Sequence, residues 1–167
     1  LNIGQPDLPT PPPFWQAIQG ACQGTLAYTH SAGTASMRSK WADFYTRRGL
    51  PVQADEVLIT TGGSEAILFA FAATLDAGDE VIVPEPLYAN YTSYATLLGV
   101  KLVPITTHIA QGFDLPAANA FEALITPRTK GIIVCNPGNP TGKVYLRPAL
   151  EKLRDLALAH DLYLYAD

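Results

Sequence analysis

Residues 131–142 read Gly-Ile-Ile-Val-Cys-Asn-Pro-Gly-Asn-Pro-Thr-Gly, a continuous apolar run that leads into a loop rich in proline and glycine. A short apolar run without alternation is typical of a strand that is buried on both faces of a parallel sheet. Two prolines and two glycines within residues 136–142 disfavour both helix and strand. Such a restricted loop can hold the side chain of Asn139 in one orientation, so we interpret it as a ligand-contacting loop. The alternative is an ordinary turn between a strand and a helix.

Similar apolar runs recur along the chain and alternate with helical patterns. We expect strands at 57–61, 81–83, 101–105, 131–135 and 162–166. Apolar residues three and four positions apart predict helices at 14–22, 37–48, 64–75, 88–98, 116–125 and 150–160. The helix at 64–75 is apolar nearly all round and should be deeply buried. Strands separated by helices predict an α/β fold of three layers, α/β/α, around a mainly parallel sheet, and leave the strand order open.

Composition and charge exclude several classes of protein. Of the 167 residues, 48% are hydrophobic and 16% charged, which is ordinary for a soluble globular domain, and the formal net charge is −4. No basic run is present, so nucleic acid is not expected as a partner. No apolar stretch approaches the roughly 20 residues of a membrane helix. Cys22 and Cys135 lie in apolar segments and are expected to be buried free thiols, which fits a cytoplasmic protein. We predict no metal site.

A second candidate segment, Gly62-Gly63-Ser64-Glu65, follows the strand expected at 57–61 and opens directly into a helix. Glycines let the backbone approach a ligand closely, and a helix N-terminus offers free N–H groups to an anion such as phosphate. Ser64 could donate its hydroxyl to a phosphate oxygen, or it could cap the helix. A plain capped turn is therefore the alternative interpretation.

Asp167 follows the apolar strand expected at 162–166. A carboxylate there is costly unless it faces a partner, such as a cation or a ring N–H, although an aspartate that caps a helix or lies in a turn would also explain it. In open α/β sheets, ligands bind beyond the carboxyl ends of the strands. Since three strand ends carry unusual residues, we expect them to converge on one binding site.

With these segments the chain resembles the class I and II aminotransferases of pyridoxal-phosphate fold type I. The resemblance rests on Asn139-Pro140-Thr141-Gly142, Gly62-Gly63-Ser64-Glu65-Ala66-Ile67 and Tyr165-Ala166-Asp167. Further similar motifs occur in the family's order: Gly4-Gln5-Pro6-Asp7, then Tyr28, Gly33 and Met37-Arg38 (with methionine for the usual leucine), Gly78-Asp79-Glu80-Val81, and Pro84-Glu85-Pro86-Leu87-Tyr88. The resemblance covers essentially the whole chain. It implies that residues 1–25 are an N-terminal segment associated with a small domain, and that residues 26–167 are part of a large cofactor-binding domain.

The resemblance implies a role for each matching position, with pyridoxal 5'-phosphate as cofactor. Gly63 and Ser64 would hold the cofactor phosphate, and Tyr88 would stack on the pyridine ring as one of two catalytic residues. Asn139 would hydrogen-bond the phenolic oxygen of the ring and lie against the substrate. Asp167, the other catalytic residue, would pair with the pyridine nitrogen and keep it protonated. A core aromatic is the alternative for Tyr88.

Two further residues would lie at the edge of the site. Gly4 would approach the substrate carboxylate, because a residue without a side chain leaves room there. Tyr28 would reach the cofactor phosphate of a partner subunit, which implies a homodimer with shared active sites. A surface or core tyrosine is the alternative for Tyr28.

The resemblance implies an enzyme that moves an amino group between an L-amino acid and a 2-oxo acid, in amino-acid biosynthesis. The family's Schiff-base lysine and its carboxylate-binding arginine correspond to positions beyond Asp167, so we expect the 167 residues alone to be inactive. The lysines present match no family lysine and are interpreted as solvated charges: Lys40, Lys101, Lys130, Lys143 and Lys152. The same residues also fit a C–S β-lyase or a related fold-type-I enzyme. A third possibility is the aminotransferase-like sensor domain of a transcription regulator.

Overall fold

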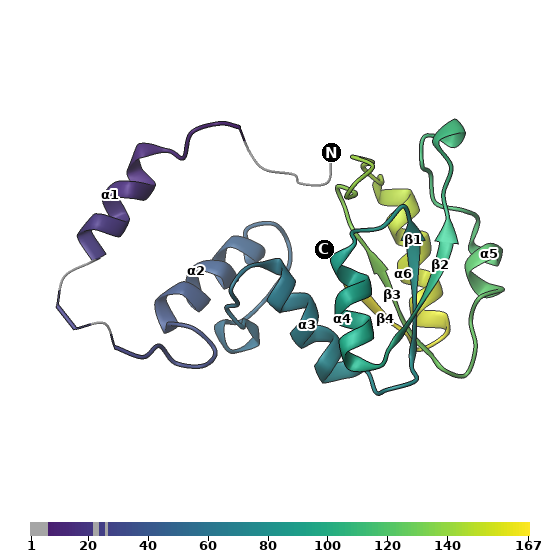
Figure 1. The fold of residues 1–167 in the computed structure, drawn as a ribbon, viewed down its shortest axis with the longest axis horizontal. Helices are drawn as coiled ribbons and strands as arrows, with labels where there is room; N and C mark the ends of the chain where they lie inside the picture. Colours follow the sequence, from purple (N-terminus) through teal and green to yellow (C-terminus); the bar gives the residue numbers. More distant parts are fainter. Residues whose placement is uncertain (1–6, 22–23, 26) are drawn as a thin grey trace. The chain divides into compact units, whose positions relative to one another are not determined.

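The computed structural model describes residues 7–21, 24–25 and 27–167. The chain divides into two compact units, Leu1–Ile59 and Thr60–Asp167, each described below by itself (Figure 1). No helix within the described ranges is long and apolar enough to cross a bilayer. The predicted domain boundary near residue 25 refers to a larger protein and stays a prediction.

The first unit contains α1 (Pro12–Ala21), α2 (Ala35–Thr46) and a short 3₁₀ turn, η1 (Ala54–Glu56). The two predicted helices are confirmed. Thr34 caps α2, since its Oγ1 accepts a hydrogen bond from the backbone N–H of Met37 at 3.3 Å. Within α1 and α2 the only buried side chain is that of Ala42. Large apolar side chains of these helices are exposed instead: Phe14, Trp15, Ile18, Met37, Trp41 and Tyr45.

The prediction of a strand at 57–61 is wrong. None of the described residues pairs with this segment through strand hydrogen bonds. The N–H of Ile59 donates to the carbonyl of Ala32 at 3.1 Å, which is an isolated contact between two loops. Gly33 has a φ of +91°, and a Cβ at Gly33 would lie 2.5 Å from the side chain of Ile59. Apolar and β-branched residues favour a strand only where a neighbouring strand can pair with them.

The second unit is the α/β part of the chain. Its elements are α3 (Gly63–Thr74), β1 (Glu80–Glu85), α4 (Asn90–Leu98), β2 (Lys101–Thr106), η2 (Ile109–Gln111), α5 (Ala118–Glu122), β3 (Thr129–Val134), α6 (Arg147–Ala159) and β4 (Tyr163–Ala166). The strands form one sheet in the order β2-β1-β3-β4, and all three neighbouring pairs are parallel. The predicted parallel α/β fold is confirmed, and the strand order is what the structure adds.

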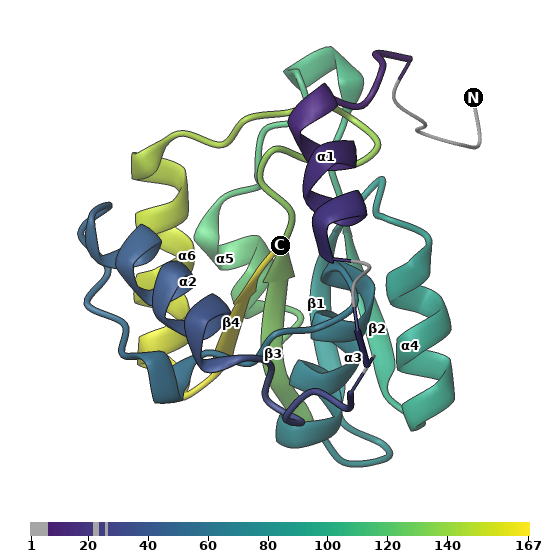
Figure 2. The ribbon, with the colours of Figure 1, turned by 90° about the vertical axis from the view of Figure 1, so that its left-hand side faces the viewer.

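The sheet has one apolar core on each face. Val81 and Val83 of β1 pack with Phe71 of α3 and Tyr91 of α4 on one face. The side chain between these two valines, Ile82, points to the other face, where it packs with α5 and α6. Figure 2 shows α3 and α4 on one side of the strands and α5 and α6 on the other. This is the predicted three-layer arrangement.

The prediction that the helix at 64–75 is deeply buried holds only in part. Phe71 is buried within α3, but the side chain of Phe69 is 43% exposed. Helix α3 packs on the sheet and on α4 through one side, whereas several of its other apolar residues are exposed: Ala66, Phe69, Ala72 and Ala73.

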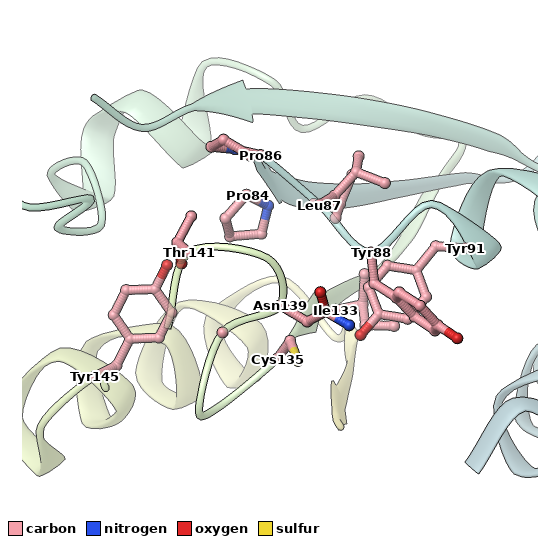
Figure 3. A pocket seen from close by; sticks show the side chains of 12 residues that line it. Pro84, Pro86, Leu87, Tyr88, Tyr91, Ile133, Cys135, Asn139, Thr141 and Tyr145 are labelled. Atoms are coloured by element: carbon pink, nitrogen blue, oxygen red, sulfur yellow. The ribbon is translucent and has the colours of Figure 1, made fainter. Parts of the chain in front are cut away.

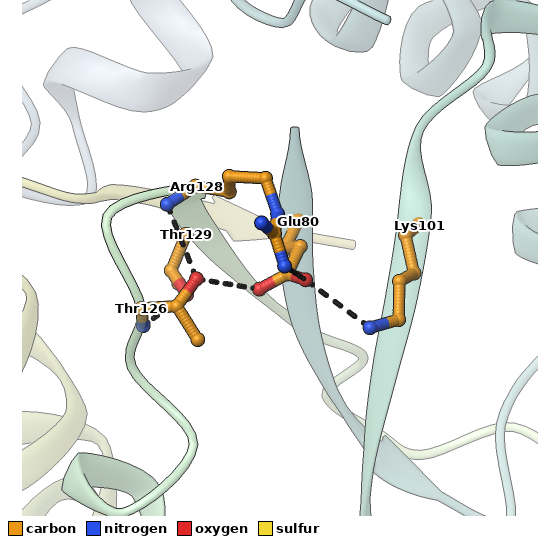
Figure 4. A network of polar contacts seen from close by, with 5 residues as sticks. All are labelled: Glu80, Lys101, Thr126, Arg128 and Thr129. Carbon is orange, nitrogen blue, oxygen red and sulfur yellow. Dashed lines mark hydrogen bonds and ion pairs between the residues drawn. The ribbon is translucent and has the colours of Figure 1, made fainter. Parts of the chain in front are cut away.

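Glu80, the first residue of β1, has a fully buried carboxylate (Figure 4). Its Oε1 accepts from Lys101 Nζ and from an Arg128 Nη, both at 3.1 Å, and its Oε2 accepts from Thr126 Oγ1 at 2.7 Å. Hydrogen bonds from Thr126 and Lys101 lower its pKa from 4.5 to about 2. Lys101 is mostly exposed, as interpreted from the sequence, but its ammonium also pairs with this buried carboxylate. The network joins the N-terminal ends of β1 and β2 to the segment before β3, at the end of the sheet opposite the candidate site.

Candidate active site

The candidate site lies where the parallel strands end. β1, β3 and β4 end at Glu85, Val134 and Ala166, so the segments that follow these strands meet at the carboxyl edge of the sheet. A hollow of about 410 Å³ opens there, within the roughly 300–1,000 Å³ of small-molecule sites. It is lined by Gly63, Ser64, Ile67, Tyr88, Cys135, Asn136, Pro137, Asn139 and Asp167. Five predicted site residues thus come together: Gly63, Ser64, Tyr88, Asn139 and Asp167.

Asp167 is held by its backbone and by one side-chain partner. Its N–H donates to Val134 O at 3.0 Å, and its carbonyl accepts from Asn136 N at 2.9 Å, which continues the β3–β4 ladder. The hydroxyl of Tyr91 donates a short hydrogen bond to Oδ2 of Asp167. Asp167 is exposed at the carboxyl edge of the sheet. Among the described residues, the side-chain partner of this carboxylate is therefore the hydroxyl of Tyr91.

Gly62 and Gly63 open helix α3 next to Asp167. Gly62 is the N-cap, with a φ of +82° that favours glycine, and it makes no side-chain cap. Glu65 secures the turn, because its Oε2 accepts from the N–H of Thr61 at 2.6 Å. Ser64 is not the N-cap residue, so its hydroxyl remains at the hollow together with the first N–H groups of the helix. This arrangement of N–H and O–H donors suits an anionic group.

Hydrogen bonds within residues 136–145 hold the loop at 136–142 in place. Asn136 makes two bonds to Tyr145: its Oδ1 accepts from the backbone N–H at 2.8 Å, and its Nδ2 donates to the carbonyl at 3.3 Å. Gly138 N donates to Lys143 O at 2.7 Å, and Gly142 N donates to Gly138 O at 2.8 Å. The loop therefore presents the exposed Asn139 from a backbone that is tied at both ends.

Tyr88 lies two residues before the start of α4. Its hydroxyl accepts from Nδ2 of Asn90 at 2.6 Å, and its ring meets Tyr91 edge to face, with centroids 5.5 Å apart and planes at 87°. Figure 3 shows Tyr88 and Tyr91 together, with Asn139 and Cys135 nearby. Tyr88 is half-buried: it packs against the core below the sheet edge and also lines the hollow.

The remaining predictions for single residues have separate outcomes. Gly4 lies outside the described residues, and so does Cys22. Tyr28 belongs to the first unit, where its side chain is fully exposed. Lys143 is not a solvated charge, because its Nζ pairs with Asp114 at 2.5 Å and only 23% of its side chain is exposed.

The sequence interpretation missed two residues of the site. Tyr91 was not predicted to contact Asp167, although its spacing of three from Tyr88 places both on one side of a helical turn. Cys135 was expected to be a buried thiol, but it is half-buried and lines the hollow. Cys135 directly follows the last residue of β3, so its side chain lies at the carboxyl edge of the sheet, where ligands bind. This position is the sequence signal that could have identified it.

Comparison with known proteins gives one consistent result. The family model for aminotransferase class I and II matches residues 1–167. The aspartate/prephenate aminotransferase of Thermus thermophilus is 39% identical over 169 residues, which cover all of this chain and 44% of that protein. The arginine–pyruvate transaminase of Pseudomonas aeruginosa is 36% identical, and the match covers 43% of its length. This chain thus spans less than half the length of these relatives.

Solved structures of similar proteins have the same fold. The aspartate aminotransferase of Thermotoga maritima superposes with a TM-score of 0.93 at 34% identity, covering 99% of this chain and 44% of that chain. The aspartate aminotransferase of Thermus thermophilus with maleate superposes with a TM-score of 0.92 at 38% identity, covering 99% and 44%.

Proposed function

This chain belongs to the class I and II aminotransferases, and we propose that it forms the pyridoxal 5'-phosphate cradle of an enzyme that transfers an amino group between an L-amino acid and a 2-oxo acid. The observation that carries the proposal is the hollow at the carboxyl edge of the sheet. Donors suited to a phosphate, an aromatic ring, an amide and a carboxylate line it together. These four groups correspond to the phosphate, the ring face, the phenolic oxygen and the ring nitrogen of the cofactor.

The residues of the hollow fit the cofactor in chemical type. The free N–H groups at the start of α3, with the Ser64 hydroxyl, would bind the phosphate, because a helix N-terminus carries partial positive charge. A Cβ on Gly63 would lie 3.9 Å from Asp167 Oδ1, so the start of α3 and the carboxylate border the same space. Asn139 would donate from its amide to the phenolic oxygen of the ring.

Each side chain then has a distinct task in amino-group transfer. Tyr88 would keep the ring in one plane by contact with its face, and the hydrogen bond from Asn90 orients the tyrosine. Asp167 would hold a proton on the ring nitrogen, because an adjacent negative charge favours the protonated ring. When bound, pyridoxal phosphate accepts the electrons that remain after the Cα proton of the amino acid departs.

We further propose that the protein is a homodimer, with Tyr28 contributing to the partner's site and Gly4 lying near the substrate carboxylate. The fully exposed side chain of Tyr28 supports a contact outside its own unit. Cytoplasmic location and a role in amino-acid biosynthesis also belong to this proposal. The free thiol of Cys135 is consistent with a reducing compartment.

The test uses the complete protein, with the residues that follow Asp167. Pyridoxal phosphate is added, and oxo-acid formation is measured with L-aspartate and L-arginine as donors and 2-oxoglutarate or pyruvate as acceptor, because the relatives are named for such donors. We expect turnover with at least one pair, and a large loss in the Asp167→Ala variant. Preferential release of ammonia and pyruvate from a cysteine-type substrate would instead identify a β-lyase. Cofactor binding without either reaction would favour a sensor domain.

A further inference from the structure

Tyr91 combines a buried ring with a hydroxyl that reaches the proposed site. Its side chain is 1% exposed and packs in the core formed by α3, α4 and the sheet. Its hydroxyl donates to Oδ2 of Asp167, which lies 76 residues further along the chain. A buried hydroxyl without a partner costs about 1–3 kcal/mol, so this bond is retained whenever the core is packed.

The bond leaves one oxygen of Asp167 free for a ligand. Oδ2 is taken by Tyr91, whereas Oδ1 lies toward the start of α3, 3.9 Å from the position of a Cβ on Gly63. A carboxylate at the end of an edge strand can rotate about its χ angles, and each rotation would present a different atom to the hollow. The Tyr91 hydroxyl selects one of these orientations.

The direction of the hydrogen bond is set by the surroundings of Tyr91. Burial, followed by the hydrogen bond to Asp167, raises the pKa of the Tyr91 hydroxyl above its ordinary value. Tyr91 therefore stays protonated and acts as the donor, and Asp167 acts as the acceptor. Because Tyr91 also meets the ring of Tyr88 edge to face, the first turn of α4 orients both the ring contact and the carboxylate.

We propose that Tyr91 is a positioning residue of this site: its hydroxyl holds Oδ2 of Asp167 so that Oδ1 faces the hollow and accepts the ring N–H of the cofactor. The inference rests on the proposed function and assigns a role to a residue that does not itself touch the cofactor. A role confined to packing would require the ring of Tyr91 but not its hydroxyl.

The test compares Tyr91→Phe with the unchanged complete protein, because phenylalanine keeps the ring and removes only the hydroxyl. The apo protein is titrated with pyridoxal phosphate, and binding is followed by visible absorption and equilibrium dialysis. We expect the cofactor Kd to rise about tenfold, the effect of losing one hydrogen bond to a charged group. We also expect kcat to fall while KM for the amino donor changes less than about twofold. Tyr94→Phe, in the same helix and against the same core, is the matched control and should leave both values unchanged.

A double-mutant cycle separates positioning from packing. If Tyr91 acts through Asp167, Tyr91→Phe should change the cofactor Kd less than about twofold in an Asp167→Ala background. An equal effect in both backgrounds, or an unchanged Kd in Tyr91→Phe alone, would overturn the inference while the proposed function stands. If the unchanged protein does not bind pyridoxal phosphate, the proposed function fails, and this inference fails with it.

Discussion

The Glu80 network makes a prediction about acid stability that does not depend on any ligand. Glu80→Gln keeps the size of the side chain and removes its charge. The amide oxygen can still accept from Thr126, but the attraction to Lys101 and Arg128 is lost. We expect the second unit to become less stable at neutral pH, and we expect most of this difference to disappear in acid.

The magnitude follows from the pKa of Glu80, which is lowered from 4.5 to about 2. Since one pKa unit corresponds to about 1.4 kcal/mol, the charged form contributes at most about 3–4 kcal/mol to stability. The side chains of Lys101 and Arg128 are each 66% exposed, so solvent screens their attraction to the buried carboxylate. We therefore expect Glu80→Gln to destabilise the unit by about 2 kcal/mol at pH 7.

The sign of the pH dependence follows from the same shift. The unfolded chain binds a proton at Glu80 below about pH 4.5, whereas the folded protein does so only near pH 2. The stabilisation by Glu80 is therefore complete above about pH 4.5 and is lost as the pH falls toward 2. The unchanged protein should lose stability over this range, and the difference from Glu80→Gln should shrink accordingly.

The assay is urea denaturation at pH 7, 5, 4 and 3. Far-ultraviolet circular dichroism is the suitable signal, because both tryptophans, Trp15 and Trp41, belong to the first unit. With a urea dependence of about 2 kcal/mol/M, the midpoint of Glu80→Gln should be lower by about 1 M at pH 7. Glu122→Gln, at an exposed position of α5, is the control for loss of one negative charge. A midpoint difference that is the same at pH 7 and pH 3, or equal to that of the control, would refute the reasoning.

Three further changes test the core, the loop and the helix start. Gly131→Ala should destabilise the second unit by about 1–3 kcal/mol in thermal or urea unfolding, because the new Cβ would lie 2.6 Å from the Tyr165 ring and 3.0 Å from the Tyr163 carbonyl; unchanged stability would show that β4 can shift freely. Asn136→Ala removes both bonds to Tyr145 and should cost about 1–3 kcal/mol of stability, while hydrogen exchange at the N–H of Tyr145 becomes faster; unchanged exchange would contradict this role. Ser64→Ala should leave unfolding unchanged, because Ser64 does not cap α3, but should weaken pyridoxal phosphate binding to the complete protein about tenfold; equal affinity in a titration would remove Ser64 from the phosphate site.

Most elements of the second unit could be predicted from local patterns. Continuous apolar runs predicted β1, β2, β3 and β4. Burial on both faces explains the runs of the central strands β1 and β3, whereas the edge strands β2 and β4 are largely exposed. The strand expected at 57–61 fails because a strand depends on its neighbour, and the described residues provide none. The burial of α3 was overestimated for a related reason: an all-apolar helix shows that cover is required, but it does not show which segment provides it.

The sequence by itself determined the types of most elements and the residues at their ends. The proline and glycine positions of 136–142, the glycines before α3 and the carboxylate after β4 are local features, and short-range backbone preferences are enough to interpret them. Only the tertiary structure decided which of these groups meet. The order β2-β1-β3-β4 brings α3, α4 and the end of β4 to one edge, and Tyr91 then reaches Asp167 across 76 residues. Such a contact depends on distances between segments far apart in the chain, which local preferences do not encode.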